Sequence, residues 1–164
     1  MIFLSVGTQL PFNRLVSYLD GWVRENVDPM DVFAQVGPLP LDLTPCFRTV
    51  ASLPADQFLT SVKNCRIFVS HAGMGNIITA LEVGRPIVIV PRQRSLGEHR
   101  NDHQLHTADK FRDYAGVFVA RDYDEFKASM TTAWTASPKA AEMTPERLRL
   151  VDYVRRFITD GGPH

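Results

Sequence analysis

Short apolar segments alternate along this chain with segments whose apolar residues recur every three or four positions. Residues 2–6 form an apolar run that stops at Gly7-Thr8, and residues 12–23 then have the spacing of one helical face. Further strands are predicted at 32–36, 46–50, 66–70, 87–90 and 116–120. Further helices are predicted after Asp56, which can cap the helix that follows it, and at 77–83, 101–114, 123–134 and 145–158. Because alternating strands and helices need crossover connections, the sequence predicts an α/β, Rossmann-like, mainly parallel sheet with helices on both faces.

Composition fits one soluble globular domain over residues 1–164, since 45% of the residues are hydrophobic and 22% are charged. Lys and Arg together number 18, as do Asp and Glu, so no overall positive field exists to attract nucleic acid. No run reaches the roughly 20 apolar residues that span a bilayer, and no basic leader opens the chain. We therefore expect a cytoplasmic protein with reduced thiols at Cys46 and Cys65, held at any membrane by something else.

A glycine-containing turn at residues 71–76 connects a predicted strand to a predicted helix. Gly73 and Gly75 leave main-chain N–H groups open to a phosphate or diphosphate, and Asn76 either caps the helix or meets the ligand. A tight turn that needs glycine for its dihedral angles is the alternative. The turn lacks the third glycine of the dinucleotide fingerprint, and no P-loop is present. In a parallel sheet, this turn, the Gly7-Thr8 turn and the loop after residue 91 all lie at the carboxyl edge, where ligands bind.

Polar residues are densest between 98 and 106. His99, His103 and His106 have helical spacing, so a divalent metal site is one interpretation. A sugar site is another, with Asp102 and Gln104 bonding hydroxyls and with Arg92, Arg94 and Arg100 pairing with a phosphate or a carboxylate. A solvated helix start is the third. The pair in Asp122-Tyr123-Asp124 resembles a metal-binding carboxylate motif, but a helix cap explains it better.

Three segments together resemble the C-terminal, donor-binding half of glycosyltransferase family 28: residues 71–76, residues 81–91 and Asn101-Asp102-His103-Gln104. The opening segments at 3–8 and 12–16 are similar to the small catalytic subunits of split enzymes. These enzymes add the second N-acetylglucosamine to a dolichol-linked precursor or assemble bacterial exopolysaccharides. The resemblance covers about residues 1–120.

The resemblance implies a UDP-sugar bound in a GT-B-type site, with transfer that inverts the anomeric centre and needs no essential metal or other cofactor. It implies a diphosphate site at Gly7, Thr8, His71, Gly73, Gly75 and Asn76, and a sugar site at Asp102 and Gln104, to which Arg92 is added. Thr79 stands where family members often carry a ribose-binding glutamate. No residue is assigned as the general base: His71 is a weak candidate, and a partner is another source.

A GT-B enzyme has a second domain for the acceptor, so the resemblance predicts a separate, membrane-associated subunit and a lipid-linked acceptor. The protein would then lie peripherally at the cytoplasmic face of the membrane. The predicted helix at 145–158 either packs on its own sheet or docks on that partner. A non-catalytic subunit that stabilises or activates a transferase is the alternative function. A phosphosugar epimerase is disfavoured by the chain length.

Overall fold

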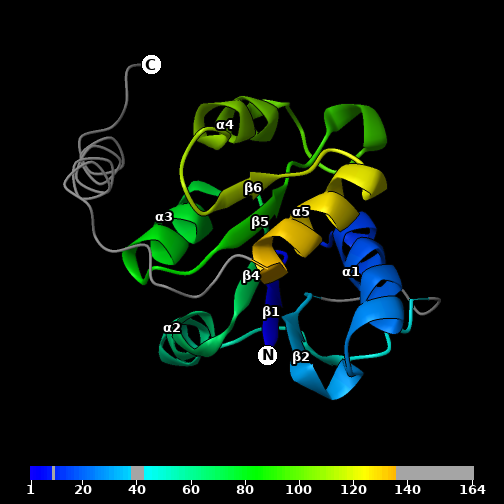
Figure 1. Ribbon diagram of the computed structural model, residues 1–164. Helices are drawn as coiled ribbons and strands as arrows, with labels where there is room; N and C mark the ends of the chain where they lie inside the picture. Colours follow the sequence, from blue (N-terminus) through cyan, green and yellow to red (C-terminus); the bar gives the residue numbers. More distant parts are fainter. Residues whose placement is uncertain (9, 38–42, 136–164) are drawn as a thin grey trace.

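A computed structural model describes residues 1–8, 10–37 and 43–135 (Figure 1). Its six strands form one sheet in the order β3-β2-β1-β4-β5-β6, and every neighbouring pair is parallel. The strands are β1 (Ile2–Ser5), β2 (Val32–Gln35), β3 (Arg48–Val50), β4 (Ile67–His71), β5 (Ile87–Val90) and β6 (Val117–Val119). The helices are α1 (Asn13–Asn26), α2 (Ala55–Asn64), α3 (Met74–Glu82), α4 (His103–Phe111) and α5 (Tyr123–Thr135). The predicted fold class is confirmed.

Helices cover both faces of this sheet, as the sequence predicts. Helices α1 and α5 lie on one face, and α2, α3 and α4 lie on the other (Figure 1). Successive strand residues point to opposite faces, so Ile2 and Leu4 join the core beneath α1 and α5, whereas Phe3 joins the core beneath α2 and α3. Strand β1 is central: its Ile2 lies opposite both Val32 and Ile67.

The helix boundaries differ from the predicted ones where a cap was inferred from residue type. Helix α2 begins after Pro54 with no side-chain cap, so the predicted cap at Asp56 is wrong; this residue lies inside the first turn. Helix α4 is shorter than predicted and begins after Asp102, because residues 97–102 form turns. The cap at Asp122 is confirmed, since its Oδ1 accepts a hydrogen bond from the Glu125 N–H at 2.8 Å.

The predicted helix at 145–158 lies outside the described residues. Among the helices that the structure does describe, none combines the length and apolar character needed to cross a membrane.

Candidate functional site

A cavity of about 620 Å³ lies at the carboxyl edge of the sheet. It is bounded by the ends of β1 and β4, by the loop after β5 and by the start of α2, so the predicted convergence of the three loops is confirmed. Its lining residues are Ser5, Val6, Gly7, Thr8, Leu10, Gln35, Leu53, Ala55, Phe58, His71, Gly73, Gly75, Asn76, Arg92, His99, His103 and Gln104. This set contains every diphosphate candidate, together with Arg92 and Gln104 but not Asp102.

The imidazole of His71 lies between two of the glycines at this edge. A Cβ added to Gly7 would approach the His71 Cε1 to 2.8 Å, and Gly7 has a φ of +85°. A Cβ added to Gly73 would overlap the His71 Nε2 and lie 2.9 Å from Cδ2. Both glycines are therefore required by the histidine ring, a reason that the sequence alone does not reveal. Gly75 differs, because a Cβ there meets nothing within 4 Å.

His71 is uncharged at neutral pH. Burial, together with the positive charge of Arg92, lowers its pKa to about 4. A neutral imidazole can still hydrogen-bond a phosphate oxygen, but a group with this pKa is a poor proton acceptor for a general base working near pH 7. This low pKa favours a binding role for His71 over a role as general base.

Helix α3 opens on the cavity with free main-chain donors. Gly73 is its N-cap and no side chain caps it. The N–H groups of Gly73 and Asn76 donate to the carbonyls of His71 at 2.8 Å and Gly73 at 3.1 Å, which leaves those of Met74 and Gly75 without a partner within the helix. Asn76 does not cap it either, as was one of the predicted alternatives: its Nδ2 donates to the Ser70 Oγ at 2.7 Å. This helix start is consequently available to an anion.

Polar side chains buried at the ends of the strands support the turn at Gly7. The Ser5 Oγ donates to the Gln35 Oε1 at 2.7 Å and accepts from the Gly7 N–H at 3.3 Å. The Ser70 Oγ donates to the Ser5 carbonyl at 3.1 Å. These residues were not predicted from the sequence, although a polar residue at the end of an apolar strand was the available signal.

Arg92 is almost fully buried and its guanidinium binds the main chain. Its Nη2 donates to the carbonyls of Val6 at 2.9 Å and Leu10 at 2.6 Å. Its Nη1 donates to the carbonyls of Pro11 at 2.7 Å and Glu98 at 3.4 Å. The guanidinium thus fastens the β1–α1 loop to the β5–α4 loop, and its positive charge borders the cavity from within the protein.

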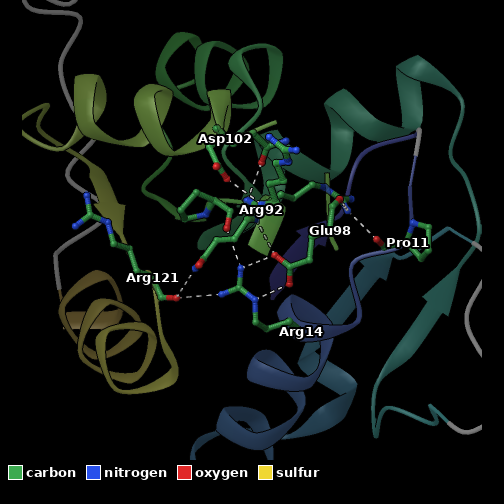
Figure 2. Close-up of polar contacts among 10 residues, drawn as sticks. Pro11, Arg14, Arg92, Glu98, Asp102 and Arg121 are labelled. Carbon is green, nitrogen blue, oxygen red and sulfur yellow. Dashed lines mark hydrogen bonds and ion pairs between the residues drawn. The ribbon is translucent and has the colours of Figure 1, made fainter. Parts of the chain in front are cut away.

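Arg14 and Glu98 form a second link between these loops (Figure 2). The Arg14 Nε lies 2.6 Å from the Glu98 Oε1, and its Nη2 lies 2.8 Å from the Oε2. The same guanidinium donates to the carbonyls of Pro91 at 2.8 Å and Arg121 at 3.0 Å. Burial lowers the pKa of Arg14, but the hydrogen bond and the charge of Glu98 outweigh it, so the pKa stays above its ordinary value.

Two of the predicted sugar-binding residues, Asp102 and Gln104 at the start of α4, also hold the β5–α4 loop. The Gln104 Oε1 accepts from the Arg92 N–H at 3.1 Å, and the Asp102 Oδ1 accepts from the Arg94 N–H at 2.9 Å.

Thr79 stands where the resemblance leads us to expect a ribose-binding glutamate. Its hydroxyl donates to the Gly75 carbonyl at 2.8 Å within its own helix.

His99 and His103 meet at the cavity, with ring centroids 4.5 Å apart. His103 also contacts the Asn101 Oδ1 through its Nδ1. In the described part of the chain, no group of three or more His, Cys, Asp or Glu side chains is arranged to hold a metal ion.

Comparison with known proteins agrees with this geometry. The profile of the glycosyltransferase family 28 C-terminal domain matches residues 1–147. The chain belongs to this family. A comparison of the chain with curated protein sequences found no match.

Several solved structures share this fold. The chain is similar to the glycotransferase of kitacinnamycin, at 18% identity and a TM-score of 0.59, over 98% of this chain and 40% of that one. A UDP-glucose: anthocyanidin 3-O-glucosyltransferase in complex with UDP gives 14% identity and a TM-score of 0.61, over 98% and 37% of the two chains. The chain therefore spans about two fifths of these enzymes. ALG13, solved by NMR, gives 16% identity and a TM-score of 0.59, over 92% of this chain and 94% of that one.

Proposed function

We propose that this chain is the donor-binding domain of an inverting glycosyltransferase that moves a sugar from a UDP-sugar to a lipid-linked acceptor in exopolysaccharide or glycolipid assembly. The observation that carries the proposal is the uncapped start of α3, which opens on the cavity beside the Gly7 turn and the neutral His71. Membership of family 28 supports it, and one structural neighbour holds UDP.

The diphosphate of the donor is assigned to the start of α3. Main-chain N–H groups and the positive end of the helix dipole favour a group with negative charge there. The open space beside Gly75 lets phosphate oxygens approach, and Thr8 and His71, which line the cavity from the two neighbouring turns, are proposed to donate to them. In the proposed reaction, the acceptor hydroxyl attacks the anomeric carbon and UDP leaves, so the same donors stabilise the charge that grows on the diphosphate.

The sugar is assigned to the β5–α4 side of the cavity. Gln104 lines the cavity and its Oε1 is already bonded to Arg92, which leaves its amide nitrogen for a sugar hydroxyl. Arg92 and Asp102 act here mainly by shaping the loop, because their bonds go to main-chain groups. Donor binding is proposed to need no metal, since main-chain donors and the Arg92 charge supply the positive potential; binding that persists in excess chelator would agree.

The acceptor is proposed to bind a separate, membrane-associated subunit, which holds this chain peripherally at the cytoplasmic face. The resemblance to split enzymes supports this arrangement, as does the match to ALG13 over nearly the whole of both chains. The low pKa of His71 fits a general base that the partner provides.

Isothermal titration tests the proposal. The purified chain, alone and with its membrane subunit, is titrated with UDP, UDP-glucose, UDP-galactose, UDP-glucuronic acid and UDP-N-acetylglucosamine. Selective binding of one sugar nucleotide supports donor binding and names the sugar. No binding even with the partner present would favour the non-catalytic subunit.

A matched pair of variants locates the binding site. Gly75→Asp places a carboxylate at the start of α3 in open space, so we expect a folded chain without measurable UDP affinity, whereas Gly75→Ala should bind far better than Gly75→Asp. Unchanged affinity in Gly75→Asp would place the diphosphate elsewhere.

A further inference from the structure

The two loops that flank the cavity are joined to each other mainly by side chains. Main-chain hydrogen bonds within residues 93–98 stay inside that segment, running from Leu96 and Glu98 to Gln93 and from Gly97 to Arg94. In the described part of the β1–α1 loop, the carbonyls of Leu10 and Pro11 accept hydrogen bonds from Arg92. The relative position of the loops therefore depends on the side chains that bridge them.

We infer that Arg14 and Glu98 are positioning residues that clamp the β5–α4 loop against the start of α1 and so preorganise the donor cavity. The inference rests on the proposed function and concerns residues outside the cavity lining. Arg14 stands in the first turn of α1, directly after the β1–α1 loop, and reaches the carbonyl of Pro91 at the end of β5 and that of Arg121 before α5. One side chain thus joins its own helix start to two segments that are distant in sequence, residues 91–98 and Arg121 (Figure 2).

The Arg14 guanidinium and the Glu98 carboxylate pair through two charge-assisted hydrogen bonds. Arg14 uses its Nε and Nη2 on the two oxygens of Glu98, an arrangement that fixes direction as well as distance. The Glu98 Oε2 also accepts from the Gln93 N–H at 2.9 Å, which ties the carboxylate to its own loop. The two side chains are only 15% and 12% exposed, so water competes weakly for these bonds.

The charge of Glu98 also stabilises the guanidinium of Arg92, which bridges the same two loops. Burial lowers the pKa of Arg92, and the negative charge of Glu98 opposes that effect. Without the Glu98 carboxylate, Arg14 and Arg92 are two mostly buried cations that lack its negative charge. Their repulsion would separate the β1–α1 loop from the β5–α4 loop, both of which line the cavity.

Two conservative variants test the clamp. Glu98→Gln keeps the shape and removes the charge, while Arg14→Lys keeps the charge and removes the fork. Their matched controls lie away from the cavity. Arg66→Lys alters an arginine that donates to the Trp134 carbonyl at 2.6 Å and lies over the Trp134 ring. Asp124→Asn alters a carboxylate that is 91% exposed and paired with Lys127.

Hydrogen exchange without ligand measures the clamp independently of the proposed function. In Glu98→Gln and Arg14→Lys we expect faster exchange of amides in residues 6–12 and 92–98, with β4 and α5 as in the wild type. The two control variants should show wild-type exchange in these loops. Unchanged loop exchange in both clamp variants would overturn the inference.

Calorimetric titration with UDP then measures the consequence for the donor, at a temperature where thermal unfolding shows every variant to be folded. We expect the Kd for UDP to rise about tenfold in Glu98→Gln and Arg14→Lys and to stay unchanged in the controls. Saturating UDP should slow loop exchange in the clamp variants toward wild-type values. A purely structural pair would lower the melting temperature and leave the Kd unchanged, which would contradict the positioning role. A wild-type chain that fails to bind UDP would instead overturn the proposed function, and the donor part of this inference with it.

Discussion

The His71 ring occupies the space that a side chain at Gly7 or Gly73 would fill. Glycine at these two positions therefore permits a close approach between two turns, from β1 and from β4, that the strand register places side by side. A phosphate bound at the proposed site would lie beside this ring, because the space over Gly73 is already taken.

Gly73→Ala should destabilise the chain by about 2 kcal/mol, because the added methyl group displaces the His71 ring. Urea unfolding measures the change. Gly75→Ala is the matched control: its methyl group enters open space in the first turn of α3, so the free energy of unfolding should be unchanged or slightly higher. In a His71→Ala background, Gly73→Ala should cost much less; an equal cost in both backgrounds would mean that another contact is responsible.

His71 should make the folded state sensitive to acid. Its pKa is about 4 when folded and about 6.5 when unfolded, so the unfolded chain binds more protons between these values and stability falls as pH falls. Between pH 7 and pH 5 the loss from this group is about 2 kcal/mol. We expect His71→Gln to flatten the pH dependence of the unfolding free energy over this range. Equal slopes in the wild type and in His71→Gln would contradict this.

Some residues of the site could be predicted from the sequence and others could not. Glycines after an apolar strand indicate a turn at the sheet edge, and the diphosphate candidates indeed line one cavity. The main-chain partners of Arg92 could not be predicted, because every residue offers a carbonyl and only the folded loops select which ones Arg92 reaches. Arg14 and Glu98 are 84 positions apart, so no local pattern connects them.

At the level of elements, helix α2 contacts the rest of the fold through few residues. Val62 is its fully buried side chain, and Phe58 packs its ring against Phe3 and Phe68 at centroid distances of 5.6 and 6.0 Å. Phe58 also lines the cavity. The helix therefore depends on an aromatic cluster that is shared with the sheet and with the wall of the site.

Phe58→Ala should destabilise the chain by about 2–3 kcal/mol, below the usual loss for a fully buried phenylalanine because this ring is only partly buried. Phe58→Leu refills part of the space and should recover about half of that loss. Thermal unfolding of the two variants gives the comparison. Leu59→Ala, on an exposed position of the same helix, serves as the control, and a loss there as large as at Phe58 would show that α2 is destabilised by other means.

Helix existence was easier to predict than helix starts, for a physical reason visible in α2. The apolar spacing shows which residues face the core, but a helix starts where its first main-chain bond forms. In α2 the Pro54 carbonyl accepts from the Phe58 N–H at 2.9 Å, so the helix begins before Asp56. In α3 the amide of Asn76 satisfies Ser70 instead of its own helix. Both residues have the right type for a cap, and tertiary contacts decided otherwise.

For the whole molecule, the fold class followed from alternation alone, since crossover helices dictate parallel pairing. The strand order did not follow, because the alternating pattern is compatible with several arrangements. The order β3-β2-β1-β4-β5-β6 brings the ends of β1 and β4 together at the point where the chain changes direction across the sheet, which is where ligands bind in such folds.

The balance of 18 basic and 18 acidic residues gives a net charge near zero at pH 7. We expect solubility to pass through a minimum close to pH 7, because little repulsion then opposes association. Static light scattering at fixed protein concentration from pH 6 to pH 9 measures this. If the chains associate through the surface that the proposed acceptor subunit covers, co-expression with that subunit should remove the solubility minimum. Scattering that changes steadily across the range would contradict the expectation.

The central place of β1 has a consequence for biosynthesis. This strand leaves the ribosome before either of its neighbours. Ile2 pairs with both Val32 and Ile67, so one edge of β1 stays unpaired until β2 is synthesised and the other until β4 is synthesised. At translation rates of roughly 5–20 residues per second, the second side stays open for several seconds. During that interval an apolar strand with an unpaired edge is exposed to other nascent chains. The nascent protein should therefore bind chaperones until residues 67–71 have emerged, and the cavity is complete only later, once the lining residues up to Gln104 have followed.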